Sequence, residues 1–209
     1  MMSRDGSRPG SASEAALFAR SDDFIAEIRS EFPRFCIIPK RESPLSRFID
    51  VVLKVLTFGA QREFMTRYHT VLWDRLYVPE LWERTPDLAR LITLRHERIH
   101  LRQRRRHGDF VMTFLYLVPF FPLGLAYGRA RIEWEAYTET IRATAELRGL
   151  EAARSPELRR HILKQFMSGA YGWMWPFPRT LDRWYDAALA QIEAELRAPR
   201  APASGPNNA

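Results

Sequence analysis

The chain has 209 residues, of which 46% are hydrophobic, which is enough for one domain with its own core. The 32 Lys and Arg residues outnumber the 25 Asp and Glu residues, which gives a net charge of +7. We interpret most of these charged side chains as part of a solvated surface. Cys36 is the only cysteine and excludes an internal disulfide, and the N-terminus lacks the continuous apolar core of a secretory signal. We therefore expect a cytoplasmic protein.

The two ends of the chain have compositions that disfavour a packed core. Residues 1–12 read as a disordered lead, and residues 197–209 form a tail rich in Pro, Ala and Asn. We expect a single domain over residues 13–196.

The first half contains segments with the periodicity of regular structure. Helices are predicted over residues 13–32 and over 44–58, the second ending near Gly59, with a short strand within PRFCIIPK (33–40). Residues 68–79 are rich in aromatic and β-branched side chains, which favours a strand pair that turns at Trp73 and Asp74.

A long helix is expected next, over ERTPDLARLITLRHERIHLRQRRR. Thr85 is a candidate N-cap, Pro86 suits the first helical position and Asp87 suits the first turn. At about 100° per residue, His96 and His100 lie about 40° apart, at the edge of the apolar stripe of this helix. They therefore point in one direction, near the core.

The apolar run over residues 110–127 approaches the length of a membrane span, but Pro119, Pro122 and Gly124 interrupt it. We expect a buried helix followed by a segment turned by proline. The alternative is a hairpin in a membrane interface, which the arginines on both flanks would suit.

The second half is predicted to be helical. Helices are expected over about 128–147, from Ser155 with Pro156 and Glu157 in its first turn, and over about 180–196. The expected fold class is α+β, predominantly helical, with a small antiparallel sheet before the histidine-bearing helix.

His96-Glu97-Arg98-Ile99-His100 fits the pattern H-E-x-x-H. Zinc hydrolases need three protein ligands and an open position for water, and two histidines at i and i+4 supply two of the ligands. The glutamate after the first histidine then accepts a proton from the zinc-bound water.

The branch of this motif that continues with a glycine and a third histidine is excluded. Gln103 stands where the glycine should be and Arg106 where the histidine should be, and His107 is one position late, which leaves it as an outside candidate.

The third ligand is sought in the helix over 128–147, which carries Glu133 and Glu135. Residues two apart on a helix point about 200° apart, so only one of them can face the histidines, and the apolar periodicity leaves the choice open.

Over about residues 68–140 the chain resembles the gluzincin metallopeptidases. In that family the second helix carries a ligand glutamate, a small residue three positions later and usually an aspartate four positions later. Glu133 and Ala136 match this register, and Tyr137 replaces the aspartate. The resemblance implies a zincin-like fold with zinc on His96, His100 and Glu133.

The same resemblance implies roles for the neighbouring residues. Glu97 would be the catalytic base, and Tyr137 and Glu135 would lie next to the ligands and orient them. It also implies a β-strand before the active helix that binds an extended peptide along its edge, which only residues 68–79 could supply.

The loop 169–178 concentrates aromatic residues between Gly and Pro. It is either a hydrophobic plug or a lid over the site, in which case Tyr171 is a candidate catalytic donor to the oxyanion. His161 is a weaker candidate for that role.

These observations favour a zinc-dependent peptidase that acts on a peptide or protein substrate. One alternative is a catalytically inactive protein on the same scaffold that binds metal or contacts a membrane surface through residues 110–127. Another is a basic protein that binds nucleic acid through Arg102 to Arg106, which is disfavoured because, apart from that run, no dense basic patch with interleaved aromatics stands out.

Overall fold

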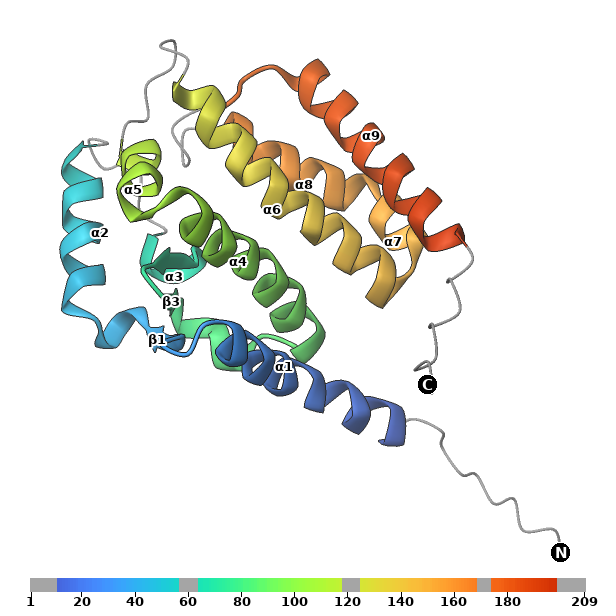
Figure 1. Cartoon of the computed structure of the whole chain (residues 1–209), viewed down its shortest axis with the longest axis horizontal. Helices are drawn as coiled ribbons and strands as arrows, with labels where there is room; N and C mark the ends of the chain where they lie inside the picture. The colour runs from blue at the N-terminus through green and yellow to red at the C-terminus, as the bar shows by residue number, and fades with distance from the viewer. Residues whose placement is uncertain (1–10, 57–63, 118–124, 169–173, 199–209) are drawn as a thin grey trace, which may run out of the picture.

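The structure, a computed structural model, describes residues 11–56, 64–117, 125–168 and 174–198 (Figure 1). Several predictions fall outside these ranges. They concern most of the two expected disordered ends, the end of the helix near Gly59, the proline-turned part of the apolar run and Tyr171.

Helices account for most of the described chain. In chain order they are α1 (Ser11–Glu31), α2 (Pro44–Leu56), α3 (Phe64–Arg67), α4 (Asp87–His107), α5 (Asp109–Leu117), α6 (Leu125–Arg148), α7 (Leu150–Arg154), α8 (Pro156–Met167) and α9 (Pro178–Arg197), with short 3-10 helices η1 (Lys40–Glu42) and η2 (Glu80–Arg84). The helices predicted from periodicity are found within a few residues of their expected bounds.

A small sheet contains β1 (Cys36–Pro39), β2 (Thr70–Leu72) and β3 (Arg75–Val78), in the order β1-β3-β2. The predicted strand pair turning at Trp73 and Asp74 is confirmed, and Trp73 has a φ of 53°. The expectation of a purely antiparallel sheet is wrong, because β1 pairs parallel to β3. Parallel pairing becomes accessible because α2 lies in the long connection between these strands.

The start of α4 differs by one residue from the prediction. Pro86 is the N-cap and Asp87 is the first helical residue, while Thr85 is the C-cap of η2. The hydroxyl of Thr85 donates to the carbonyl of Leu81 at 3.0 Å and so does not cap α4.

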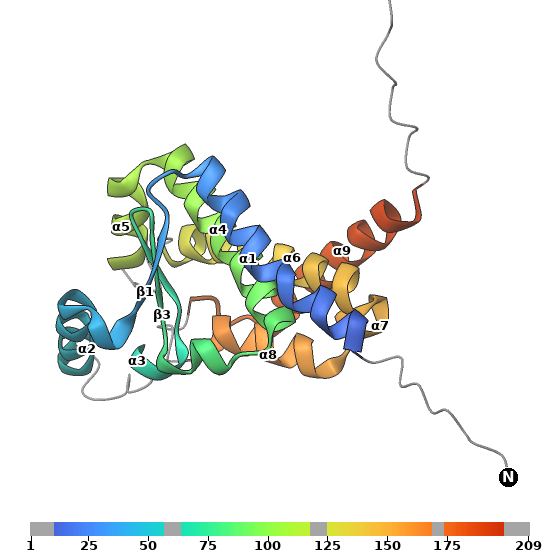
Figure 2. The ribbon, with the colours of Figure 1, turned by 90° about the horizontal axis from the view of Figure 1, so that it is seen from below.

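Two apolar clusters lie on opposite sides of the α4–α6 pair. One, between α1, the sheet and α4, includes Ile28, Leu76 and Leu94. The other, between α6, α7, α8 and α9, includes Ile162 and Tyr185. The long helices α4 and α6 pack side by side between these clusters (Figures 1 and 2).

The helix predicted at the start of the apolar run is found as α5, but the expectation that it is buried holds for only one side of it. Met112 on α5 is buried, but 84% of Phe110 is exposed, and Val111 and Phe114 are about half exposed. Among the described residues, no helix is long and apolar enough to cross a membrane.

Candidate metal centre

Three ligand-type side chains converge where α4 passes α6. The Nε2 atoms of His96 and His100 lie 3.2 Å apart, and Oε2 of Glu133 lies 3.6 Å from Nε2 of His100. One ligand atom from each of the three residues lies within 4.8 Å of the others. Zinc–nitrogen bonds of about 2.0–2.1 Å at tetrahedral angles separate ligand atoms by about 3.4 Å. The first two separations are therefore close to what one small ion requires.

The sequence brings these groups together by simple helical geometry. The four-residue spacing of His96 and His100 places both rings on the side of α4 that faces α6. Ala136 follows Glu133 by one turn on α6 and is fully buried. Because its side chain is a single methyl group, the two helices can approach closely at this point.

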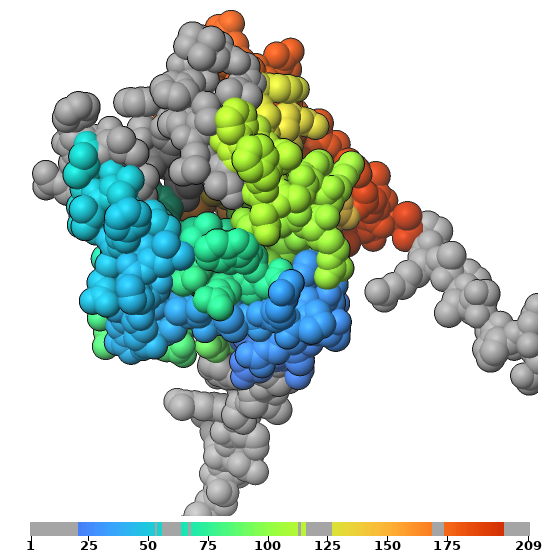
Figure 3. All heavy atoms as spheres, turned by 60° about the vertical axis from the view of Figure 1, so that its left-hand side comes forward, coloured from blue at the N-terminus to red at the C-terminus, as the bar shows by residue number. Residues whose placement is uncertain are grey.

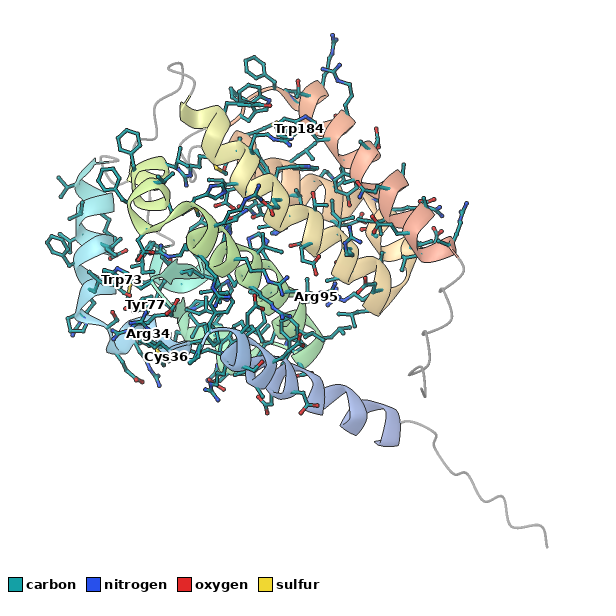
Figure 4. All side chains as sticks on the ribbon, viewed as in Figure 1. Arg34, Cys36, Trp73, Tyr77, Arg95 and Trp184 are labelled. Atoms are coloured by element: carbon teal, nitrogen blue, oxygen red, sulfur yellow. The ribbon has the colours of Figure 1, made fainter. Side chains whose placement is uncertain are left out.

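A pair of charged contacts holds the helices in this position. Arg95 on α4 donates from Nε to Glu139 of α6 at 2.6 Å. It also forms an ion pair with Glu146, seven residues further along α6. Figure 4 shows Arg95 in the space between the two helices. The arginine that directly precedes His96 therefore fixes the α4–α6 contact beside the site.

Thr140 orients the ring of His96. Its hydroxyl lies 3.0 Å from Nδ1 of His96 and donates its own proton to the carbonyl of Ala136. The hydroxyl oxygen is thus free to accept from an Nδ1–H, which leaves the lone pair of Nε2 directed at the ligand group. Such a partner on the outer nitrogen is what metal-binding histidines usually have.

Gln103 does the same for His100. Its Oε1 lies 2.9 Å from Nδ1 of His100, and its Nε2 donates to the carbonyl of Ile132 and to Oε2 of Glu135 at 2.9 Å. Both amide donors of the buried Gln103 are therefore occupied, so its oxygen accepts from the ring. Gln103 thus supports the second histidine.

The two residues expected beside the ligands differ in their contacts. The ring of Tyr137 packs edge-on against His96, with centroids 4.8 Å apart. Glu135 is exposed and lies outside the ligand group, and it reaches the site only through Gln103. The sequence analysis did not identify Thr140 or Gln103 as supports, because it looked for one only at positions 135 and 137 of α6.

Burial and neighbouring charges shift the pKa of each group in the site. Burial raises the pKa of Glu97 to about 7, and Glu133 adds to this, while His100 and Lys40 oppose it. Burial by itself lowers the pKa of His100, but Glu133, together with Glu97 and Gln103, raises that pKa to about 9. Burial and His100 lower the pKa of His96 to about 3.

Two further groups next to the site were missed by the sequence analysis. Lys40 is buried, and its Nζ donates to the carbonyl of Phe64 at 2.7 Å. Burial lowers its pKa to about 7, although Glu97 and Asp50 act in the opposite direction. As one of only three lysines, placed directly after a strand, it offered a weak signal, but nothing in the sequence pairs it with Glu97.

The second is His69, which directly precedes β2. Its Nε2 is buried and has no hydrogen-bond partner among the described residues, and its ring packs edge-on against Trp82. Burial, together with Lys40, lowers the pKa of His69 to about 4. The charge of His69 also acts on His96, so it is a neighbour of the ligand group.

The remaining candidates lie elsewhere or outside the described residues. His107 is exposed at the end of α4, and His161 is exposed on α8, 3.5 Å from Gln165. Neither belongs to the group of three. Tyr171 lies outside the residues that the structure describes.

Comparison with known proteins gives no independent assignment. No protein-family model, no curated protein and no solved structure matches this chain. The function must therefore be argued from the chemistry of the site.

Proposed function

We propose that the protein is a zinc-dependent peptidase whose metal is held by His96, His100 and Glu133. The observation that carries the proposal is the separation of the ligand atoms, 3.2 Å and 3.6 Å, together with a partner on the outer nitrogen of each histidine. Two imidazoles and one carboxylate are a donor set that suits zinc and leaves a fourth position open for water.

In this proposal Glu97 is the general base. Zinc, when bound, brings the pKa of its water to about 7, so that hydroxide is available at neutral pH. Glu97 would accept a proton from the attacking water and would then deliver it to the leaving amine. Burial raises the pKa of the Glu97 carboxyl, which favours its gain of a proton in the first of these steps.

His69 and Lys40 are suited to polarise the substrate carbonyl. Nε2 of His69 lacks a partner within the described residues, and the low pKa of the ring keeps it neutral, so it can carry one proton to donate. Lys40 lies close enough to Glu97 for each to affect the pKa of the other. Tyr171 stays a candidate donor from the sequence.

The described sheet has two edge strands, β1 and β2, because each pairs only with the central β3. Of the two edges, we favour β2 for an extended peptide, because β2 contacts α4. A peptide that adds to β2 would run beside the helix that carries Glu97. This narrows the strand expected from residues 68–79 to Thr70–Leu72.

The nucleic-acid alternative is weakened by internal contacts of the basic run. Arg102 forms an ion pair with Glu31, Arg104 pairs with Asp109, and Arg105 donates to the carbonyl of Glu31. These guanidinium groups tie α4 to α1 and α5, so they are not free to contact phosphates.

The decisive experiment combines metal analysis with turnover. Protein purified without added metal is measured for zinc content, and the same preparation is assayed with a mixed library of internally quenched peptides. We expect one zinc per chain in the wild type, and loss of that zinc in His96→Ala and Glu133→Gln. Glu135→Gln is the matched control, because its carboxylate lies outside the ligand group.

Glu97→Gln separates catalysis from metal binding. We expect this variant to keep its zinc and to lose peptide cleavage by at least about 100-fold, as for removal of a general base. Full zinc retention by folded Glu133→Gln would overturn the metal site. A zinc-loaded wild type that cleaves no peptide would instead favour the inactive metal-binding alternative.

A further inference from the structure

Helix α2 exposes part of its apolar side, whereas an ordinary surface helix turns its apolar side toward the core. On one side Phe48, Val51 and Val55 are 66%, 58% and 68% exposed. On the other side Ser46 and Asp50 are buried against the rest of the protein. Three apolar side chains of α2 thus point into solvent while two of its polar side chains point inward, which costs solvation free energy unless something covers the exposed apolar residues.

A second exposed apolar surface lies at the same end of the molecule. On α5, Phe110 and Phe114 are four residues apart and therefore share one side of the helix, while Met112 anchors the opposite side in the core. Figures 1 and 2 show α2 and α5 at the end away from α7 and α9, and Figure 3 shows both bordering one face. We call these five exposed side chains, together with Val111, the α2/α5 face.

Cations border this face. At about 100° per residue, Arg47 and Lys54 lie next to each other on one flank of the apolar arc of α2. Arg47 is exposed, and Lys54 is 46% exposed while its Nζ reaches Asp50 at 2.6 Å. At the other helix, the exposed Arg106 lies in the last turn of α4, three residues before α5 begins.

We propose that the α2/α5 face lies in the plane of an anionic phospholipid membrane. Helices of this kind bury apolar side chains at the boundary of the acyl chains while flanking Lys and Arg remain at the level of the headgroups. The charge of the whole chain, +7, adds attraction to such a surface. A second copy of the chain fits less well, because it would bring two cationic flanks and two positive net charges together.

The proposal does not depend on zinc or on peptidase activity. It replaces the sequence-based idea of membrane contact through residues 110–127 by a surface in which α2 contributes half of the apolar side chains. The sequence pattern of α2 gave no hint of this, since an amphipathic helix normally covers the core with its apolar side.

The test uses the full chain and sedimentation with vesicles of phosphatidylcholine, with and without phosphatidylserine. We expect the wild type to sediment with the anionic vesicles, more weakly with phosphatidylcholine alone, and more weakly at high salt. Phe48→Ser combined with Val55→Ser should lower the partition coefficient at least about tenfold, because two inserted side chains are lost. Phe110→Ser should lower it as well.

Leu196→Ser is the matched control, because Leu196 is also an exposed apolar residue, 44% exposed, but lies near the end of α9. Its vesicle binding should equal that of the wild type. Circular dichroism of each variant checks the fold, which substitutions at exposed sites should leave intact.

Two outcomes overturn the proposal. One is a wild type that fails to bind anionic vesicles, or whose binding is unchanged by the Phe48 and Val55 substitutions. The other is a stable dimer in sedimentation velocity that the same substitutions convert to monomer, which would assign the face to a second copy of the chain.

Discussion

Helices α2 and α9 are both amphipathic, yet the protein uses them in opposite ways. α9 buries Leu181, Tyr185 and Ile192 against α6, α7 and α8. α2 exposes Phe48 and Val55 and buries polar residues instead. The difference shows that a periodic apolar face identifies a helix but does not decide what that face contacts.

The interiors beside these two helices also differ, in their polarity. The interior near α9 is apolar, and its buried tyrosine hydroxyl donates to the carbonyl of Ala153 at 2.7 Å. The interior between α2 and α4 contains Lys40, Asp50 and Glu97, whose charges act on one another. Buried charges carry a desolvation cost, and such groups cluster where a protein binds or transforms a ligand.

The largest expected effect tests the packing of the two helices directly. Leu181→Ala should lower the free energy of unfolding by about 2–5 kcal/mol, because it leaves a cavity in a core where the leucine is fully buried. Val55→Ala should change it by less than about 0.5 kcal/mol, because the side chain is 68% exposed. Urea unfolding of both variants measures the difference. Equal destabilisation would mean that the outer side of α2 is covered in solution.

A smaller effect is expected from the polar contacts between α4 and α6. Thr140→Val removes the hydroxyl beside Nδ1 of His96, and we expect zinc affinity to fall about 10- to 100-fold. Thr138→Val is the matched control, because its hydroxyl donates to the carbonyl of Trp134 on the same helix and contacts no ligand. Competitive zinc titration distinguishes them. An equal loss in both variants would point to a general effect on α6.

The smallest effect concerns the ion pairs that join α1 to α4. Hydrogen bonds from Arg102 and Arg98 lower the pKa of Glu31 from 4.5 to about 2, against the effect of burial. A depressed carboxyl pKa stabilises the fold above pH 4.5, and the contribution is lost as the pH falls toward 2. After allowance for solvent screening we expect about 1 kcal/mol at pH 7.

Glu31→Gln should therefore lower the melting temperature by about 2–4 °C at pH 7, and the difference from wild type should vanish near pH 2. Glu42→Gln is the control, because Glu42 and its partner Arg41 are both more than half exposed and such pairs contribute little. A Glu31→Gln deficit that is the same at every pH would show that the contact acts by packing and not by charge.

The sequence by itself determined the local elements of this protein. Helix periodicity, the start of α8 near Ser155 and the turn at Trp73 and Asp74 depend on residues close in the chain, so each could be predicted. The spacing of His96 and His100 fixed their common direction for the same reason. Glu133 lies beside these histidines, as expected. The choice of Glu133 over Glu135 came from a resemblance to a family, and the binding of zinc by the three residues stays a prediction.

Only the tertiary structure decided which distant groups meet. Three such contacts join residues that are more than 25 positions apart in the chain. They are the parallel pairing of β1 with β3, the approach of Lys40 and His69 to the site, and the support of His96 by Thr140. No local pattern encodes such contacts, because they depend on how the elements pack. The same holds for α2. The sequence shows that this helix has an apolar side, but the polar groups buried beneath α2 decide that Phe48 and Val55 face outward.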